Sequence, residues 1–204
     1  TYATGQIPFD TVYLHGLIRT RDGKKMSKSD PSTCIDPLEV IPQFGADALR
    51  MSMIVGQSPG NDFRLYEEKI AGYRNFVNKL WNASRFVLMH VSSEDTQMQP
   101  EHLTLSEQWI LSRCTKTAIA VKEGIETYRF NEAASAIYQF VWHEFCDWFI
   151  EAEKPALYEK EGIERQNTAR QVLASVLKDI LIMLHPFMPF VTEEIYHLLP
   201  TAQG

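Results

Sequence analysis

The sequence predicts a mainly α-helical protein in which a small α/β segment precedes a helical bundle. From Phe63 onward, apolar residues recur in steps of three and four, which is the period of a helix with one buried face. Before Asn61, short apolar runs alternate with glycine and proline, a pattern typical of short strands, turns and short helices. The glycine- and proline-containing stretch 56–61 therefore marks a boundary between a first part, residues 1–61, and a second part, residues 62–204.

Residues 1–61 are expected to hold three short elements and one long loop. The β-branched and aromatic run 11–15 predicts a strand, and the polar, basic stretch 16–30 predicts a loop. Asp36 followed by Pro37 is typical of a helix start, because the aspartate can cap the first turn and proline suits the first helical position. Residues 46–55 predict a second helix.

Residues 62–204 are expected to form five helices, separated by a polar loop at 92–101 and an extended apolar connector at 185–190. Asn131 and Thr192 are expected to cap the helices that follow them, and Pro155 is expected to end the third helix. Helices with apolar stripes and short links favour a bundle. The expected bounds are 63–90, 106–128, 131–154, 164–184 and 192–199.

Composition and charge narrow the class of protein. The chain has 204 residues, of which 45% are hydrophobic and 23% charged, an ordinary globular balance. No apolar run approaches the roughly 20 residues of a membrane helix. A net charge of −6 argues against a protein that holds nucleic acid mainly through its overall field. Three well-separated cysteines without a recognisable secretory leader favour free thiols in the cytoplasm. The opening residues, which lack an initial methionine, favour a segment of a longer protein.

The richest chemistry lies in a basic loop. The stretch 19–28 carries five cationic side chains, and Ser27 and Ser29 add hydroxyl donors. Ammonium groups and hydroxyls in such a loop can hold phosphate, although a simple solvated loop is the alternative that the residues alone favour. A nucleotide-binding P-loop is excluded, because Ile18 stands where glycine is required and Lys25 stands where serine or threonine is required.

The residues Lys25-Met26-Ser27-Lys28-Ser29 resemble, letter for letter, the KMSKS signature of class I aminoacyl-tRNA synthetases. The resemblance covers nearly the whole chain, and it is closest to the valine-specific members of that family. It implies an α-helical anticodon-binding domain after the end of a catalytic domain that contacts the tRNA stem. Similar stretches also occur at 4–9, 12–19, 35–38, 45–50, 74–83, 145–151 and 185–194.

The resemblance implies a reaction in which the carboxylate of valine attacks the α-phosphate of ATP, followed by transfer of the aminoacyl group to the 3′ end of tRNA. Lys28, and after it Lys25, are the expected catalytic cations for the leaving pyrophosphate. The expected ATP-binding set is Lys25, Met26, Ser27, Lys28 and Ser29. Mg²⁺ is expected to bridge the phosphates, and no protein ligand for it is recognised. Because no His-Ile-Gly-His-like motif is present, the chain alone is expected to be inactive.

The chain departs from the family directly after the signature. Asp30-Pro31-Ser32 stands where the family usually has a short run with glycine and asparagine. Pro31 would stiffen the loop and Asp30 adds a negative charge beside it, so loop closure is expected to differ in a direction that the residues leave open.

The predicted helix 63–90 has a polar face opposite its apolar stripe. Asparagine side chains on that face can read base edges, and Phe86 can stack on a splayed base, or else pack against another helix. The resemblance implies that this helix faces the anticodon loop of tRNA. The expected tRNA contacts are Arg74, Asn75, Lys79, Asn82, Arg85 and Phe86.

Other interpretations were weighed against the synthetase. His143-Glu144 opens like a zinc-protease motif, but Asp147 replaces the second histidine, so no metal site is expected. A ligase for isoleucine, leucine or methionine and a stand-alone tRNA-binding module stay open as alternatives. A helical scaffold with an accidental basic loop would not explain the similar stretches on both sides of the boundary. No membrane or protein partner is indicated.

Overall fold

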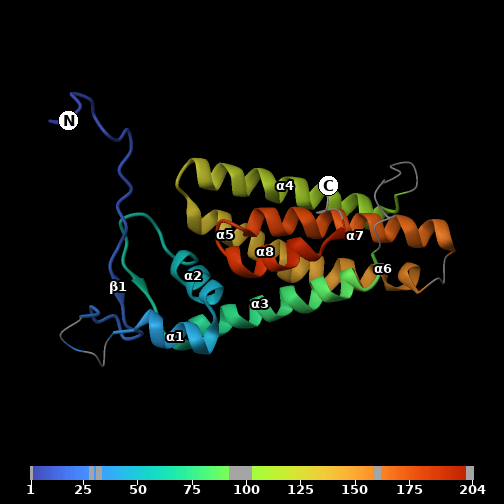
Figure 1. The fold of residues 1–204 in the computed structure, drawn as a ribbon, viewed down its shortest axis with the longest axis horizontal. Helices are drawn as coiled ribbons and strands as arrows, with labels where there is room; N and C mark the ends of the chain where they lie inside the picture. Colours follow the sequence, from blue (N-terminus) through green and yellow to red (C-terminus); the bar gives the residue numbers. More distant parts are fainter. Residues whose placement is uncertain (1, 28–29, 31–33, 92–102, 159–161, 201–204) are drawn as a thin grey trace.

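The computed structural model describes residues 2–27, 30, 34–91, 103–158 and 162–200. In these residues the chain forms a bundle of long helices, and the N-terminal segment extends along one end of it (Figure 1). One small sheet of two short strands lies at the same end. The expected mainly α-helical fold class is confirmed.

The sheet joins the beginning and the end of the first part of the chain. Strands β1 (Ile18–Arg19) and β2 (Phe63–Arg64) are parallel, with Ile18 opposite Phe63. The predicted strand at 11–15 is wrong. That segment is largely exposed and forms no ladder. The Gly60 amide donates to the Leu14 carbonyl at 2.9 Å, but parallel pairing with β2 begins only at Ile18.

Two short helices follow as predicted. Helix α1 (Pro37–Phe44) begins with Pro37 at its first position, and the Asp36 carboxylate accepts a hydrogen bond from the Leu38 amide at 2.8 Å. Helix α2 (Ala46–Ile54) comes directly after Gly45, whose φ of 89° lies in the left-handed region that favours glycine.

All five predicted helical segments of the bundle are confirmed, with changes at their ends. The third segment is one continuous helical run in which α5, the π-helix η3 and α6 follow each other. The predicted loop 92–101 lies outside the described residues. The elements are α3 (Glu67–Leu88), α4 (Leu105–Glu126), α5 (Phe130–Gln139), η3 (Phe140–Phe149), α6 (Ile150–Leu157), α7 (Ile163–Leu184) and α8 (Pro189–Leu198).

Four details of these helices correct the sequence predictions. The first long helix begins at Glu67 rather than residue 63, because the residues before it pair as β2. Pro155 lies inside α6 near its end, where the burial of neighbouring core residues holds the last turn. Asn131 does not cap α5, because its side chain accepts a hydrogen bond from the Gly56 amide. Thr192 lies within α8 and donates to the Met188 carbonyl instead.

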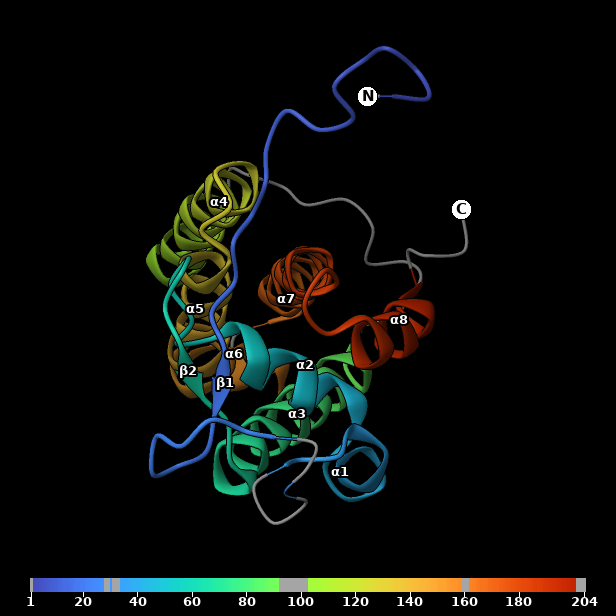
Figure 2. The ribbon, with the colours of Figure 1, turned by 90° about the vertical axis from the view of Figure 1, so that its left-hand side faces the viewer.

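Helix α7 lies in the middle of the bundle, with α4 and α5 on one side, α3 below and α8 on the other side (Figure 2). The large core around it includes many fully buried side chains, among them Phe76, Phe145 and Leu177. Trp148 of η3 lies outside this core, since it is 72% exposed. Among the described residues, no helix is both long and apolar enough to span a bilayer.

A second, smaller core lies beside the sheet. Val40, Leu49, Phe63, Leu65 and Ile70 are among its members, so it is built from residues on both sides of the predicted boundary at residue 61. Helix α2 contributes to both cores and therefore joins the two parts of the molecule.

Candidate functional site

The basic stretch after β1 forms a tight hairpin. The Thr20 amide donates to the Lys24 carbonyl at 2.9 Å, and the Gly23 amide donates back to the Thr20 carbonyl at 3.0 Å. Gly23 has a φ of 84°, so the turn favours a residue without a side chain. The amide of Met26 then reaches the Ile18 carbonyl at 3.4 Å. The first half of the predicted loop is therefore anchored to the sheet.

Two of the five cations in this stretch are committed to partners within the protein. Arg19 pairs with Asp62 at 2.5 Å, and Arg21 pairs with Glu68 at 2.6 Å while lying 5.5 Å from the ring centre of Tyr66. A hydrogen bond from the Leu17 amide and a second one from Arg19 lower the pKa of the Asp62 carboxyl. These arginines hold the base of the hairpin in place.

The two lysines of the hairpin remain directed to solvent. Lys24 and Lys25 are exposed, and within the described part of the chain neither ammonium group forms an ion pair. Ser27 forms a bridge with Asp30, whose amide donates to the Ser27 carbonyl at 3.0 Å. The predicted catalytic Lys28, as well as Ser29 and the stretch 31–33, lies outside the described residues.

Among the described members of the predicted ATP-binding set, Met26 is the one that packs against the small core. Its side chain packs against the small core, beside Ile35 and Ile18. A methionine in this position holds the hairpin down by apolar contact, while its neighbours Lys25 and Ser27 supply polar groups.

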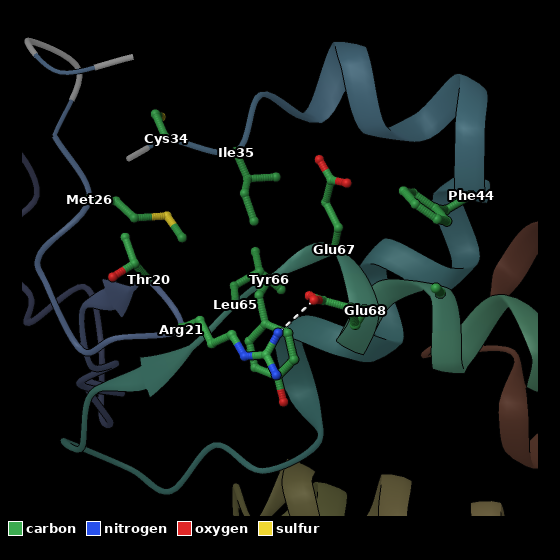
Figure 3. Close-up of a pocket in the computed structure, with 11 residues that line it drawn as sticks. Thr20, Arg21, Met26, Cys34, Ile35, Phe44, Leu65, Tyr66, Glu67 and Glu68 are labelled. Carbon is green, nitrogen blue, oxygen red and sulfur yellow. Dashed lines mark hydrogen bonds and ion pairs between the residues drawn. The ribbon is translucent and has the colours of Figure 1, made fainter. Parts of the chain in front are cut away.

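A pocket of about 530 Å³ separates the hairpin from the beginning of α3 (Figure 3). Glu67 and Glu68 lie on the helix side of it, and Met26 lies on the hairpin side. A second pocket of about 280 Å³ has Lys25 at its rim and an otherwise largely apolar lining. The lining of this second pocket is Leu17, Ile18, Lys25, Met26, Cys34, Ile35, Pro37, Leu49, Met53 and Leu65.

The predicted nucleic-acid contacts are spread along α3. Asn75, Asn82 and Arg85 are exposed on its surface. Arg74 is also exposed, but its guanidinium donates to the Gln43 carbonyl at 2.7 Å and so ties α3 to the end of α1. Because a helix rises ~1.5 Å per residue, Arg74 and Arg85 are separated by roughly 16 Å and cannot belong to one small site.

Lys79 occupies the middle of the same helix and is already engaged. Its ammonium forms an ion pair with Asp147 of η3 and lies 4.1 Å from the ring centre of Trp142. The wider π-helical turn carries both partners, and such turns often occur at functional sites.

An aromatic cluster lies at the C-terminal end of α3, and Phe86 is the one member of it that the sequence analysis had named. The half-buried ring of Phe86 is 4.6 Å from His90, which in turn meets Tyr158 at 5.7 Å. The ammonium of Lys154 lies 5.8 Å from the Phe86 ring centre, and Tyr158 is 56% exposed. Only aromatic and basic composition could have pointed to these residues, because Lys154 and Tyr158 lie more than 60 residues after Phe86 and meet it only in the folded chain.

The cysteines and carboxylates add no further site. All three cysteines are free. Among the described residues, no group of three or more His, Cys, Asp and Glu side chains is arranged to hold a metal ion.

Comparison with known protein families gives a match for the hairpin part of the chain and another for the helical bundle. Residues 1–66 match the family model described as tRNA synthetases class I (I, L, M and V). Residues 107–203 match the model described as the anticodon-binding domain of tRNA ligase. The valine–tRNA ligase of Geobacter sulfurreducens is 50% identical over 201 residues, which cover 97% of this chain and 22% of the relative.

This chain belongs to the class I tRNA synthetases. The valine–tRNA ligases of Syntrophotalea carbinolica and Carboxydothermus hydrogenoformans are 50% and 48% identical over 96% of this chain, again with 22% of the relative covered. The chain thus spans about a fifth of the length of the curated synthetases that it matches. The resemblance inferred from the signature and its surroundings is confirmed.

Solved structures agree on the synthetase fold. A LeuRS of Agrobacterium radiobacter, determined in a ternary complex with tRNA and LeuAMS, superposes with a TM-score of 0.71 at 20% identity, covering 92% of this chain and 23% of that one. A methionyl-tRNA synthetase of Mycobacterium tuberculosis superposes with a TM-score of 0.69 at 18% identity, covering 89% of this chain and 35% of that one.

Proposed function

We propose that this chain is part of an ATP-dependent ligase that attaches valine to its tRNA, and that it supplies the ATP-closing loop and the anticodon-binding part. The observation that carries this proposal is the identity of about half of all residues with proteins named valine–tRNA ligase, across nearly the whole chain. The proposed division of labour places the loop in residues 1–61 and the tRNA contact in residues 62–204.

In the proposed first step, a carboxylate oxygen of valine attacks the α-phosphorus of ATP, and the bond to the leaving pyrophosphate breaks. Lys28 and Lys25 would neutralise the charge that moves onto pyrophosphate, and Ser27 and Ser29 would donate hydrogen bonds to phosphate oxygens. The exposure of Lys25 on a hairpin anchored by Met26 supports this assignment. Mg²⁺ would be held mainly by the phosphate oxygens, and the cytoplasm is the proposed compartment.

The first test is valine-dependent exchange between ATP and pyrophosphate in the full-length ligase. Charge removal next to a developing charge costs about 100-fold in rate, so Lys28→Ala is expected to lose about that factor and Lys25→Ala about tenfold. Lys24→Ala is a matched control, because it removes another exposed lysine of the same hairpin just outside the signature, and it is expected to keep its rate. Isoleucine and threonine in place of valine test the amino-acid identity.

Equal losses in the three lysine variants would show that only the overall charge of the hairpin matters. Faster exchange with isoleucine than with valine would refute the proposed substrate. The isolated 204-residue chain is expected to show no exchange, and measurable exchange by it would contradict the proposed division of labour.

For the tRNA contact, we propose that Asn82, Arg85 and Phe86 lie closest to the anticodon, with Tyr158 and His90 extending the stacking surface. The anticodon stem of the tRNA would be contacted by Arg74, Asn75 and Lys79, which lie nearer the beginning of α3. The support is the placement of exposed polar groups beside an aromatic cluster, since bases splayed from a loop are held by stacking and by edge hydrogen bonds.

The second test measures binding of valine tRNA to the full-length ligase, with an anticodon-swapped tRNA for comparison. Stacking on one aromatic ring contributes roughly 1–3 kcal/mol, so Tyr158→Ala and Phe86→Ala are each expected to weaken binding about tenfold or more. Asn82→Ala is expected to reduce the preference for the valine anticodon, whereas Asn167→Ala, an exposed asparagine on α7, serves as the control. Unchanged affinity in all three contact variants would refute this placement.

A further inference from the structure

The segment that leads into β2 lies directly against the segment that leads into β1. The Gly60 amide donates to the Leu14 carbonyl at 2.9 Å. Gly16 is buried, and an added Cβ there would lie 1.7 Å from the carbonyl oxygen of Asn61, so this approach requires a residue without a side chain. The close approach brings the carboxylate of Asp62 to the beginning of β1, at the base of the basic hairpin.

Asp62 holds two groups at the base of the hairpin at once. One carboxylate oxygen accepts a hydrogen bond from the Leu17 amide at 2.8 Å, and the other accepts one from Nε of Arg19 at 2.5 Å. Hydrogen bonds to an ionised carboxylate are roughly twice as strong as those between neutral groups. The first bond fixes the backbone at the beginning of β1, and the second fixes a side chain of β1.

Arg19 carries this contact across the hairpin. A second nitrogen of its guanidinium, Nη1, donates to the Gly23 carbonyl at 3.1 Å, so the side chain spans from Asp62 to the turn. The backbone of Arg19 forms an antiparallel bridge with Lys25 on the returning side of the hairpin. Asp62 is therefore connected to Lys25 through one intermediate residue.

The importance of this connection is geometric. The side chains of Arg19 and Asp62 are 36% and 32% exposed, so their attraction by itself contributes little to stability. Lys25 is exposed, and among the described residues its ammonium group forms no ion pair. The position of this ammonium group therefore depends on the backbone that carries it, which is the part of the hairpin that Asp62 and Arg19 hold.

We propose that Asp62 is a positioning residue, which acts through Arg19 to hold Lys25 where negative charge develops on the leaving pyrophosphate. This inference rests on the proposed function. Asp62 contacts neither ATP nor valine in this arrangement. Displacing a catalytic group by ~1 Å can cost roughly 100-fold in rate. Because Asp62 acts through Lys25, its removal is expected to cost no more than the removal of Lys25 itself.

The experiment is valine-dependent exchange between ATP and pyrophosphate in the full-length ligase, with Asp62→Ala placed in three backgrounds. In the otherwise unmodified enzyme, kcat is expected to fall about tenfold while the KM for valine stays within about twofold, because the lost interaction belongs to the transition state. The same loss of about tenfold is expected in the Lys24→Ala background. In the Lys25→Ala background the further loss is expected to be less than about twofold, because the group that Asp62 positions is gone.

Arg19→Lys provides a second variant that leaves Asp62 in place. Lysine keeps the positive charge but lacks the planar fork that reaches Asp62 and the Gly23 carbonyl together. It is expected to lower kcat and to show the same dependence on Lys25, without a fall in melting temperature. Asp62→Asn keeps an acceptor for the Leu17 amide and is expected to recover part of the rate that Asp62→Ala loses.

Glu132→Gln is the control for the loss of an arginine–carboxylate pair elsewhere in the chain. Glu132 pairs with Arg129 at 2.9 Å in the helical bundle. This variant is expected to keep the kcat of the unmodified enzyme in all three backgrounds.

The outcomes separate the two proposals. If the unmodified ligase shows no valine-dependent exchange, the proposed function fails. If it shows exchange but Asp62→Ala and Arg19→Lys keep their kcat, the positioning role is refuted and the proposed function stands. An equal loss in all three backgrounds would show that Asp62 acts through general stability and would also refute the role. If Asp62→Ala does not fold, Arg19→Lys in the same backgrounds decides the question.

Discussion

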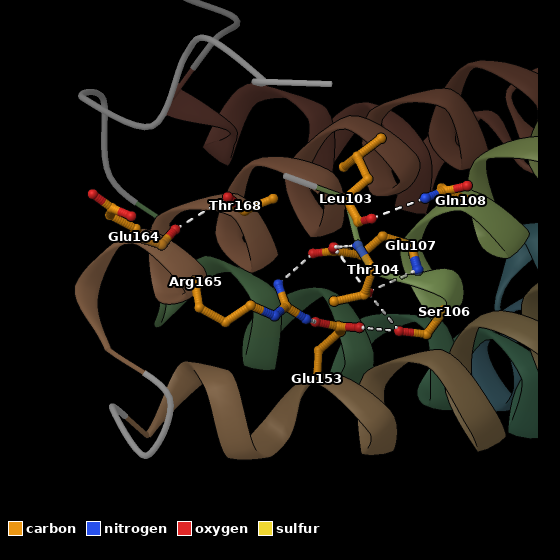
Figure 4. Close-up of polar contacts among 9 residues, drawn as sticks. All are labelled: Leu103, Thr104, Ser106, Glu107, Gln108, Glu153, Glu164, Arg165 and Thr168. Carbon is orange, nitrogen blue, oxygen red and sulfur yellow. Dashed lines mark hydrogen bonds and ion pairs between the residues drawn. The ribbon is translucent and has the colours of Figure 1, made fainter. Parts of the chain in front are cut away.

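The guanidinium of Arg165 in α7 forms an ion pair with the carboxylate of Glu107 in α4 at 2.6 Å, and the glutamate is completely buried. The same arginine pairs with Glu153 of α6, also completely buried, and Ser106 donates a further hydrogen bond to Glu153 at 2.9 Å (Figure 4). A capping box between Thr104 and Glu107 closes this cluster. Three helices thus meet at two buried carboxylates that share one cation.

Arg165→Ala is expected to destabilise the bundle by roughly 3–5 kcal/mol, because it leaves two buried carboxylates without their cation. The matched control is Arg113→Ala, which removes the ion pair between Arg113 and Glu144. The side chain of Arg113 is 41% exposed. This pair is only half-buried and keeps contact with solvent, so it is expected to contribute about 1 kcal/mol. Urea unfolding measures both free energies, and similar losses in the two variants would contradict this prediction.

The same cluster predicts a dependence of stability on pH. Desolvation by burial is the main cause that raises the pKa of the Glu153 carboxyl above its unfolded value of 4.5, and Arg165 opposes it only in part. A raised folded pKa means that the folded state holds the proton more tightly. The contribution of Glu153 to the free energy of unfolding is therefore fully present below pH 4.5, and it is lost as pH rises through the pKa of the folded state.

Glu153→Gln removes this titration. The free energy of unfolding of the unmodified protein, relative to that of Glu153→Gln, is expected to fall as pH rises from below 4.5 toward neutrality. Urea unfolding of both proteins over this range provides the measurement. A difference that stays flat, or that grows with pH, would show that the ion pair outweighs the cost of burying the carboxylate.

The cysteines are expected to differ sharply in reactivity. Burial, and after it the charge of Asp179, raises the pKa of the Cys114 thiol to about 12, and burial likewise raises the pKa of Cys146 to about 12. Because the thiolate is the reactive form, only the exposed Cys34 is expected to react with an aromatic disulfide reagent in the folded protein near neutral pH. Cys34→Ser is expected to abolish the fast reaction, and a remaining fast thiol would contradict the described packing.

Two helix glycines provide an opposed pair of stability predictions. Gly72 of α3 has no atom within 4 Å of an added Cβ, so Gly72→Ala is expected to stabilise the protein by up to about 1 kcal/mol. At Gly124 of α4, a Cβ would lie 2.8 Å from the Cβ of Ala133, so Gly124→Ala is expected to destabilise by about 1–3 kcal/mol. Thermal unfolding of the two variants gives the sign of each change in stability. A change of the same sign in both variants would be inconsistent with the close contact between α4 and α5.

Several features of the fold and the candidate site could be predicted from sequence because they depend on neighbouring residues. The start of α1 follows from Asp36 and Pro37, and the long helices follow from apolar residues at helical spacing. The KMSKS stretch could likewise be recognised from its letters. The predicted helix caps were wrong where the true partner is distant in the sequence. Asn131 accepts a hydrogen bond from the Gly56 amide, and the N-terminus of α8 is capped by Asp47.

The amino-acid sequence by itself determined the class of fold, the approximate helices and the family, because periodicity and a contiguous signature are local properties of the chain. Only the tertiary structure decided which charges are free to act. Arg19 and Arg21 are neutralised by acids more than 40 residues away, whereas Lys24 and Lys25 stay exposed. The physical reason is that a nearby partner of opposite charge reduces the attraction that a side chain can offer to a ligand, and such partners are brought close only by folding.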